Sequence, residues 1–271
     1  MLEASRRWRR DGLEVGLAPT MGALHAGHLS LVDAARRENS KVIVSIFVNP
    51  IQFGPGEDFA RYPRDLNHDA ALLRRAGICA IYRPAVDLMY PPGSSTRVHV
   101  AGVSDPLEGA ARPGHFDGVA TVVSKLFAAT EPDRAYFGQK DAQQVAVVKR
   151  MARDLDSPVQ ICACPTIREA DGLAMSSRNA YLTSAEREAA VCLSSALRLA
   201  AEAYSTGERR PEQLRKTLVD RLQAEPLASV EYAEIVDPET FTSPGSLAVL
   251  AVRVGKTRLI DNHELSHRFP G

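Results

Sequence analysis

The chain has 271 residues, of which 45% are hydrophobic and 24% charged, and its 33 basic side chains balance 33 acidic ones. A chain of this length can bury a substantial core in one large or two modest domains. The balanced charge argues against a dedicated nucleic-acid-binding protein, which usually carries a basic excess. No apolar stretch approaches the roughly 20 residues of a membrane-spanning helix, and the charged start lacks the apolar core of a signal peptide. We therefore expect a cytoplasmic protein with no nucleic-acid or membrane partner.

Strand and helix patterns alternate through about the first 160 residues, which is typical of a parallel α/β sheet. We expect strands at Val15–Ala18, Val42–Phe47, Ala80–Tyr82, Ala135–Phe137 and Val159–Ala163. We expect helices at Leu29–Arg37, Asp65–Ala76, Val119–Ala129 and Ala142–Asp154. The segment Pro91–Gly118 is rich in Gly and Pro and is predicted to be irregular.

The pattern changes after Arg168. Two helical stretches are followed by three strand-like runs: Ala185–Tyr204 and Pro211–Gln223, then Val230–Val236, Leu247–Val254 and Thr257–Ile260. Helices followed by strands indicate a second, α+β domain. The predicted fold is therefore α/β, with a Rossmann-like parallel sheet flanked by helices over residues 1–167 and a smaller C-terminal α+β lid domain over residues 168–271.

Two local clusters have ordinary explanations. Arginine residues gather near the start, and such runs usually form a solvated helix face rather than a binding arm: Arg6, Arg7, Arg9 and Arg10. The cysteines show no metal-ligand spacing, and they are expected to be reduced: Cys79, Cys162, Cys164 and Cys192. Cys162 and Cys164 alternate within an apolar run, so we expect both on one face of a strand.

The segment from Pro19 to His28 has the form His-x-Gly-His between the first predicted strand and the first predicted helix. The N-terminus of a helix presents unpaired N–H groups and a positive dipole end, which suits phosphate. Gly27 allows close approach of the backbone, and two imidazoles flank it. Far downstream, Ser176-Ser177-Arg178 offers hydroxyl donors and a planar cation that suit a triphosphate. Together the two segments predict an ATP site.

Polar side chains and a glycine that allows close approach follow the second and fourth predicted strands, where open α/β sheets bind ligands. They are Asn49, Gln52, Gly138, Gln139, Lys140, Asp141 and Gln144. Each alone has an ordinary explanation: Gln52 could be a loop amide, and Lys140-Asp141 could be a surface ion pair worth about 0–1 kcal/mol. Ser176-Ser177 could likewise merely cap a helix. Their joint occurrence at successive strand ends predicts a binding site.

The chain resembles the pantothenate synthetases (pantoate–β-alanine ligases), a family of the nucleotidylyltransferase superfamily. The motifs that carry the resemblance are PTMGALHAGH, SIFVNPIQFG, RYPRD, RPGHFDGV, YFGQKDAQQ, TIREADGLAMSSRNAYL and TRLIDN. His-x-Gly-His alone is shared by many nucleotidyl-transfer enzymes, whereas the combination is highly specific. Ala174 stands where the related class I aminoacyl-tRNA synthetases carry a lysine, a difference that pantothenate synthetases typically share.

The resemblance implies an ATP-dependent condensation of pantoate with β-alanine. Pantoate attacks the α-phosphorus of Mg-ATP to give pantoyl adenylate and pyrophosphate, and β-alanine then displaces AMP. The expected small molecules are ATP as a substrate with Mg²⁺, pantoate and β-alanine. No protein ligand to a metal is predicted, and a homodimer is expected from the family.

The resemblance also implies roles for residues. His25 and His28 would contact the phosphates, with His28 as proton donor or charge stabiliser, and the β- and γ-phosphates would be held by Lys140, Ser176, Ser177 and Arg178. The wider nucleotide site would comprise Pro19, Thr20, Met21, Gly22, Ala23, Leu24, Gly27, Gly138, Gln139, Asp141, Ile167 and Met175. Gln52 and Gln144 would bind pantoate, with Met21 nearby. Further candidates around the second substrate and the lid are Asn49, Tyr62, Arg112 and Asp69.

Three alternatives stay open. A nucleotidylyltransferase making a dinucleotide or a CDP-alcohol would keep His-x-Gly-His but has no need of paired glutamines facing a small hydroxy acid. A catalytic fragment of a tRNA ligase is disfavoured by the neutral charge and by the lack of room for an anticodon domain. A non-catalytic sensor would bind ATP without turnover.

Overall fold

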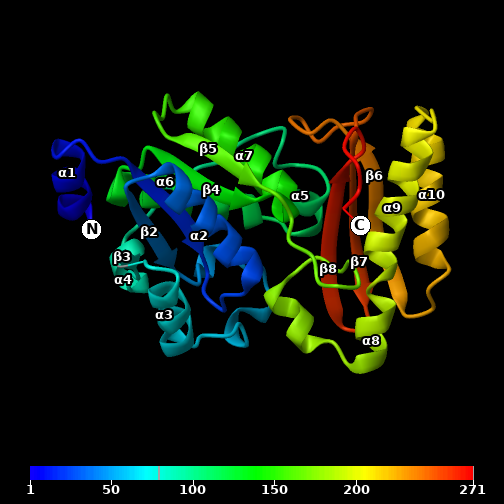
Figure 1. The fold of residues 1–271 in the computed structure, drawn as a ribbon, viewed down its shortest axis with the longest axis horizontal. Coiled ribbons are helices and arrows are strands. Elements are labelled where there is room, and N and C mark those ends of the chain that lie inside the picture. Colours follow the sequence, from blue (N-terminus) through cyan, green and yellow to red (C-terminus); the bar gives the residue numbers. More distant parts are fainter. Residues whose placement is uncertain (79, 271) are drawn as a thin grey trace. The chain divides into compact units, whose positions relative to one another are not determined.

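The structure, a computed structural model, describes residues 1–78 and 80–270. Cys79, one of the cysteines considered above, lies outside the described residues. The chain divides into two compact units (Figure 1). Unit 1 comprises Met1–Gly138 and Gln143–Pro165, and unit 2 comprises Gln139–Ala142 and Thr166–Gly271.

Unit 1 is built on a parallel sheet of five strands in the order β3-β2-β1-β4-β5, which confirms the predicted Rossmann-like sheet. The strands are β1 (Val15–Thr20), β2 (Lys41–Ile46), β3 (Ala80–Tyr82), β4 (Arg134–Gly138) and β5 (Gln160–Cys164). The chain order reverses between β1 and β4, where Gly16 pairs with Arg134 and Leu17 with Ala135. Ligands bind outside the carboxyl ends of the strands at such a reversal. The turn that follows β1 therefore starts at the place where a ligand is expected.

The helices of unit 1 are α1 (Leu2–Arg10), α2 (Ala26–Glu38), α3 (Leu66–Arg75), α4 (Val86–Met89), α5 (Glu108–Ala111), α6 (His115–Thr130) and α7 (Ala142–Asp154), with 3₁₀ turns η1 (Pro50–Gln52) and η2 (Asp58–Ala60). α2 packs Leu31 and Ala35 against Val42 and Val44 of β2, and Leu73 of α3 joins this cluster. Hydrophobic burial of this kind stabilises the fold by about 25 cal/mol per Å² of apolar surface. The core thereby fixes the start of α2 relative to the carboxyl end of β1.

Helix α6 differs from the prediction, because it begins at His115 rather than Val119. The end of Pro91–Gly118 is therefore helical rather than irregular, and α5 adds a further turn within it. Gly118 lies inside the helix, where a Cβ would come within 2.5 Å of the Gln52 Cα. Glycine lowers helix propensity, but here close backbone packing overrides that preference.

Unit 2 has an antiparallel sheet of three strands in the order β6-β7-β8. The strands are β6 (Ala228–Val236), β7 (Leu247–Val254) and β8 (Thr257–Glu264), and the helices are α8 (Ser184–Ala189), α9 (Cys192–Ser205) and α10 (Pro211–Gln223). The 3₁₀ turns η3 (Gln139–Asp141) and η4 (Ser177–Tyr181) also belong to this unit. Helices α9 and α10 run along the sheet (Figure 1), with Leu197 and Leu218 buried in the same cluster as Leu250. This is the expected α+β arrangement.

Two predicted boundaries in unit 2 are wrong. The single helix expected at Ala185–Tyr204 is two helices, separated by a tight turn in which Val191 N–H donates to Glu188 O at 3.2 Å. Neither Gly nor Pro marks that turn in the sequence, so no local signal announced it. Strand β8 continues to Glu264 rather than ending at Ile260, and it therefore includes Asp261 and Asn262.

The arginines of α1 are exposed, as expected for a solvated helix face. Arg6 pairs with Glu131 at 2.6 Å and Arg9 with Asp133 at 3.0 Å. Exposed pairs of this kind stabilise by about 0–1 kcal/mol each. Cys162 and Cys164 both contact the cluster under α2, so they share one face of β5 as predicted.

Candidate active site

The two histidines of His-x-Gly-His cap helix α2. Gly27 N–H donates to His25 Nδ1 at 3.1 Å, and His25 N–H donates to His28 Nδ1 at 3.4 Å. The ring centroids lie 4.1 Å apart. The helix therefore begins at Ala26, whereas the sequence predicted Leu29, because histidine is not among the residues that usually cap helices.

These caps also fix the tautomer of both rings. A neutral imidazole carries one proton, so a nitrogen that accepts a hydrogen bond leaves the proton on the other nitrogen. Because Nδ1 accepts in both His25 and His28, Nε2 is the protonated nitrogen of each neutral ring. The start of α2 thus combines a helix N-terminus with two imidazole N–H donors, an arrangement suited to binding phosphate oxygens.

A buried carboxylate holds the turn that precedes the helix. Asp69 of α3 accepts Ala23 N–H at 3.0 Å through Oδ2 and Leu24 N–H at 2.8 Å through Oδ1, and it is 1% exposed. Gly22 has a φ of 82°, and a Cβ there would lie 2.8 Å from Asp69 Oδ2. Asp69 was a sequence candidate near the second substrate, and the structure places it under the His-x-Gly-His turn.

The residues at the end of β1 are largely structural. Pro19 and Thr20 complete the strand. The Thr20 hydroxyl donates to Ser45 O at 2.7 Å and accepts Gly22 N–H at 3.2 Å. Met21 follows, and its sulfur lies 3.2 Å from Gln52 Nε2. The predicted neighbourhood of Gln52 and Met21 is therefore present in the structure.

Asn49, which the sequence placed among the substrate ligands, lies behind Gln52. Its amide is 1% exposed, and its Nδ2 donates to Gln52 Oε1 at 3.0 Å and to Gly118 O at 3.0 Å. Its Oδ1 accepts the hydroxyl of Tyr90 at 2.8 Å. Sequence reasoning did not identify Tyr90, because the segment around it shows no recognisable motif.

The Arg112 side chain forms hydrogen bonds with two other side chains of the protein. Its guanidinium makes a bidentate pair with Glu57, with both contacts at 2.8 Å, and its Nη1 lies 3.1 Å from His115 Nε2. Burial alone raises the pKa of Glu57, but the hydrogen bonds and charge of Arg112 bring it below its usual value. Tyr62 is buried, and its ring packs edge-on against Phe53 with centroids 6.0 Å apart. The sequence indicated Arg112 and Tyr62, but not the partner Glu57.

The neighbouring glutamines of α7 have different surroundings. Gln143 is buried, donates to Val103 O at 2.9 Å and to Pro106 O at 2.8 Å, and accepts Glu108 N–H at 3.1 Å. Gln144 is half-buried. Gln143 therefore holds neighbouring backbone groups in place. The glutamine that the sequence predicted to bind the substrate is its neighbour, Gln144.

In unit 2, strand β8 holds the backbone around Lys140. The Asn262 side chain, which is 5% exposed, donates to Gln139 O at 2.9 Å and to Lys140 O at 2.8 Å. The Lys140 ammonium lies 3.4 Å from the Asp141 carboxylate. Gly138, also predicted in this site, is the last residue of β4 in unit 1. Asn262 belongs to the TRLIDN motif, which predicted the family but gave no sign that its asparagine positions this turn.

A short hairpin presents the Ser-Ser-Arg motif. Met175 N–H donates to Ile167 O at 2.9 Å, and the backbones of Arg168 and Ala174 form an isolated antiparallel β-bridge. The Ser176 hydroxyl caps η4 by accepting Arg178 N–H at 3.3 Å. The structure therefore brings Ile167 and Met175 together, as the sequence predicted for a common site, and sets Ser177 and Arg178 in the turn that follows.

Two partly buried sets of polar contacts anchor this hairpin within unit 2. Arg168 donates to both oxygens of Asp261, at 2.6 and 3.0 Å. The Asn179 amide donates to Glu169 Oε1 at 2.9 Å and to Ala174 O at 3.1 Å. Bidentate pairs of arginine and carboxylate are geometrically specific. The loop that carries Ser176–Arg178 is therefore tied to β8, the strand that also holds Lys140.

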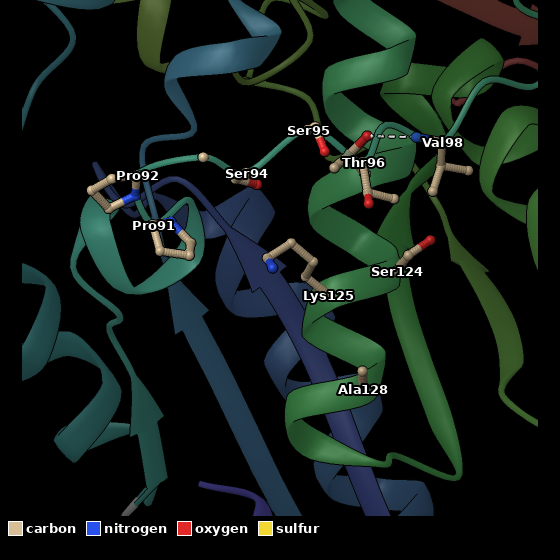
Figure 2. Close-up of a pocket in the computed structure, with 11 residues that line it drawn as sticks. Pro91, Pro92, Ser94, Ser95, Thr96, Val98, Ser124, Lys125 and Ala128 are labelled. Carbon is tan, nitrogen blue, oxygen red and sulfur yellow. Dashed lines mark hydrogen bonds between the residues drawn. The ribbon is translucent and has the colours of Figure 1, made fainter.

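A cavity of about 570 Å³ lies elsewhere in unit 1, between the loop at residues 91–98 and α6. Figure 2 shows the Lys125 side chain extending from the helix toward that loop. Hydroxyl side chains share its walls with apolar ones, and its lining includes Ser94, Ser95, Thr96, Thr121 and Ser124. Its lining residues do not include the site residues predicted from the sequence.

Neither a metal cluster nor a membrane helix is found in the described part of the chain. Residues 1–78 and 80–270 contain no group of three or more His, Cys, Asp and Glu that could hold a metal ion. No helix within these same ranges is long and apolar enough to cross a bilayer.

Comparison with known proteins decides the family. The sequence profile described as pantoate-beta-alanine ligase matches residues 1–264. The chain belongs to the pantoate–β-alanine ligase family. This confirms the resemblance that its motifs indicated, and it makes the chain a pantothenate-forming ligase.

Individual relatives span nearly the whole length of this member of the pantoate–β-alanine ligase family. A pantothenate synthetase of Herpetosiphon aurantiacus is 55% identical over 267 residues, covering 96% of this chain and 97% of the relative. A crystal structure of pantothenate synthetase from Thermus thermophilus is 50% identical, covers 93% of each chain and has a TM-score of 0.90. The pantoate–β-alanine ligase of Francisella tularensis, solved in complex with "Beta-gamma ATP and Beta-alanine", is 34% identical with a TM-score of 0.78 and covers 98% of this chain and 96% of its own.

Proposed function

We propose that this ligase joins pantoate to β-alanine through a pantoyl adenylate, with Mg-ATP as the activating substrate. A pantoate carboxylate oxygen attacks the α-phosphorus, and the bond from that phosphorus to the pyrophosphate breaks. The β-alanine amine then attacks the acyl carbon, loses a proton, and AMP leaves with the bridging oxygen. A carboxylate is a poor acylating agent, and adenylation supplies the leaving group.

The observation that carries this proposal is the pair of imidazole caps at the start of α2. In-line displacement at phosphorus depends on positioning and on stabilising charge. His25 and His28 offer Nε2–H donors beside a helix N-terminus, at the reversal of strand order where ligands bind. In the proposed mechanism both rings hold phosphate oxygens, and His28 stabilises the developing charge or donates a proton.

The remaining nucleotide contacts follow the predicted roles. Lys140, Ser176, Ser177 and Arg178 hold the β- and γ-phosphates, as a cation, hydroxyls and a guanidinium are suited to do. Gly138 and Asp141 hold the ribose, and Ile167 and Met175 border the adenine. The proposed nucleotide site also includes the turn from Pro19 to Gly27, and Gln139. Lys140 and the Ser-Ser-Arg motif belong to unit 2, which supports our proposal that this unit acts as the lid.

The small acid is bound by amides in this proposal. Gln52 and Gln144 hydrogen-bond the hydroxyls and carboxylate of pantoate, with Met21 nearby. The short distance from Met21 to Gln52 supports a common site for these two. Asn49, Tyr62 and Arg112 support the surrounding loops or the second substrate.

Three further features complete the proposal. Mg²⁺ enters bound to the phosphates of ATP, as the family resemblance implies, since Mg²⁺ commonly binds through substrate phosphates and water. The enzyme is cytoplasmic, in keeping with the free thiols of Cys162, Cys164 and Cys192, since reducing compartments keep cysteines unpaired. It is a homodimer, as the family resemblance implies, and light scattering on the purified protein measures this directly.

Isotope exchange tests the adenylate route. With pantoate and Mg²⁺ present but β-alanine absent, the enzyme should exchange labelled pyrophosphate into ATP, because the first half-reaction needs no amine. During full turnover one carboxylate ¹⁸O of pantoate should appear in AMP. A route through an acyl phosphate would instead release ADP and place the label in orthophosphate, and that outcome would reject the adenylate even if pantothenate formed.

A further inference from the structure

The side chain of Asn49 sits at the centre of a buried hydrogen-bond chain. Tyr90 OH donates to Asn49 Oδ1 at 2.8 Å, and Asn49 Nδ2 donates to Gln52 Oε1 at 3.0 Å. The same Nδ2 donates to the backbone oxygen of Gly118 at 3.0 Å. Asn49 therefore uses both ends of its amide on protein partners and contacts the site through Gln52.

The chemistry of these partners fixes the direction of every hydrogen bond in the chain. A backbone oxygen only accepts, so the amide atom of Asn49 that faces Gly118 must be the nitrogen. That nitrogen also donates to the Gln52 side chain, so the Gln52 atom that accepts must be its amide oxygen. The Gln52 NH2 group is consequently turned the other way, where its Nε2 lies 3.2 Å from the sulfur of Met21.

Tyr90 completes the chain as a hydroxyl donor. The Asn49 oxygen accepts, so the Tyr90 hydroxyl must donate to it. Burial raises the pKa of Tyr90 to about 12, and the hydroxyl stays protonated across the working range of an enzyme. Without this donor the Asn49 oxygen would be a buried acceptor that has lost its hydrogen bond, and the amide would lose one of the contacts that hold its orientation.

We propose that Tyr90 is a positioning residue for the acid substrate: through Asn49 it orients the Gln52 amide so that Gln52 offers its NH2 group as a donor to an oxygen of pantoate. This inference rests on the proposed role of Gln52 in binding pantoate. It identifies the recognised group as a hydrogen-bond acceptor, a carboxylate or hydroxyl oxygen. A substrate that presents only a donor at that position would face the wrong end of the amide.

The backbone of the Gln52 turn is held separately. His115 Nδ1 lies 2.9 Å from Gln52 O and must donate to it, since that oxygen only accepts. His115 Nε2 then accepts from Arg112, whose guanidinium is held by Glu57. Because the backbone is fixed from this side, the hydrogen-bond chain from Tyr90 controls the side-chain amide alone.

The variant Tyr90→Phe removes the hydroxyl and keeps the ring. The ring would still pack against Phe47, whose centroid is 6.1 Å away, and beside Lys125 and Arg97, each 6.0 Å from it. Losing one orienting hydrogen bond should raise the KM for pantoate about tenfold. The KM values for ATP and β-alanine should stay within about twofold of the parent enzyme, since the hydrogen-bond chain ends at the amide assigned to pantoate.

Tyr136→Phe is the matched control. Tyr136 is a buried tyrosine whose hydroxyl, like that of Tyr90, has hydrogen-bonded partners, Glu38 at 2.8 Å and Asn39 at 2.7 Å, but none of these three residues is placed in the site. Loss of the Tyr136 hydroxyl should lower the urea concentration at the midpoint of unfolding without changing the KM for any substrate. An equal rise in the KM for pantoate in both variants would show a general structural effect and overturn the proposal.

A double-mutant cycle separates the inference from the function on which it rests. If Tyr90 acts through Gln52, Gln52→Ala should raise the KM for pantoate, and adding Tyr90→Phe to it should cause no further rise. Additive effects would overturn the positioning role. If Gln52→Ala leaves the use of pantoate unchanged, the proposed substrate role of Gln52 fails. If Gln52→Ala raises the KM for pantoate but Tyr90→Phe leaves it unchanged, the proposed role of Gln52 stands and only the inference about Tyr90 fails.

Discussion

The Asp69 carboxylate accepts the backbone N–H of Leu24 at 2.8 Å and thereby ties α3 to the turn that enters His25. The second carboxylate oxygen accepts Ala23 N–H at 3.0 Å. A carboxyl group that accepts two backbone N–H groups at once fixes the position of both. One side chain therefore sets the path of the backbone from β1 into α2.

Asp69→Asn should disturb this turn while preserving size. One of the two N–H groups would face an NH2 group, so we expect a loss of about 1–3 kcal/mol in the free energy of unfolding and a raised KM for ATP. Urea unfolding and steady-state kinetics measure the two effects. Asp65→Asn is the control on the same helix: Asp65 caps α3 through the 2.9 Å hydrogen bond from His68 N–H, and asparagine caps equally well. Equal damage in both variants would argue against a special role for Asp69.

Substitutions at His25 should separate capping from catalysis. His25→Asn supplies a good N-cap for α2 but removes the Nε2–H donor, whereas His25→Ala removes both. We expect adenylate formation to fall by about 10²–10⁴ in each, the range for losing one acid–base or oxyanion-type contact. Only the alanine variant should lose about 0.5–2 kcal/mol of stability. Single-turnover rates near the parent value in His25→Asn would show that this histidine serves only as a cap.

His28→Ala should lower adenylate formation by the same factor of about 10²–10⁴. The fold should stay nearly intact, because the residue contributes a 3.4 Å cap hydrogen bond and little core. Single-turnover formation of pantoyl adenylate is the measurement. A rate within about threefold of the parent enzyme would remove His28 from the proposed mechanism.

The residues of unit 2 that are proposed to hold phosphate should differ in how much their substitution reduces activity. Lys140→Ala removes a full charge and should reduce kcat/KM for ATP more than Ser177→Ala, which removes one hydroxyl. Arg178→Lys should restore only part of the activity that Arg178→Ala loses, because an ammonium cannot reproduce the guanidinium fork. Full activity in Arg178→Lys would mean that charge alone matters at that position.

His115 should make stability depend on pH. Burial, reinforced by the charge of Arg112, lowers its pKa to about 4, whereas the unfolded chain binds the proton near pH 6.5. Between these two pH values the unfolded state binds more protons than the folded state. The contribution of His115 to the free energy of unfolding is therefore complete above about pH 6.5 and is lost as pH falls toward about 4. The expected loss is about 3 kcal/mol.

His115→Gln should flatten that slope, because its amide can keep both hydrogen bonds without titrating. Unfolding free energies of the two proteins, measured by urea at a series of pH values, give the difference. His263, whose pKa burial also lowers, is present in both proteins and cancels in that difference. Identical slopes would mean that His115 is not the group responsible.

Sequence reasoning predicted the parallel sheet correctly and selected candidate site residues because both leave local patterns in the sequence. The buried strands of unit 1 are apolar runs, and the predicted Val42–Phe47 lies within one residue of the observed β2 (Lys41–Ile46) at each end. His25 and His28 stand out because they flank a glycine at a strand end. The partners that hold such residues leave no pattern, because they come from distant parts of the chain. Asp69 is 45 residues from Leu24, and Asn262 is 122 residues from Lys140.

The hydrogen bonds from Asn262 to Gln139 and Lys140 mean that unit 2 is not one continuous stretch of chain. An expressed fragment starting at Thr166 would keep the β6-β7-β8 sheet but lack both carbonyl oxygens that the buried Asn262 amide requires. A fragment ending at Pro165 would carry Lys140 without the strand that fixes its backbone. Dissecting the gene at this point therefore cannot yield two self-sufficient halves, even though the chain passes between the units there.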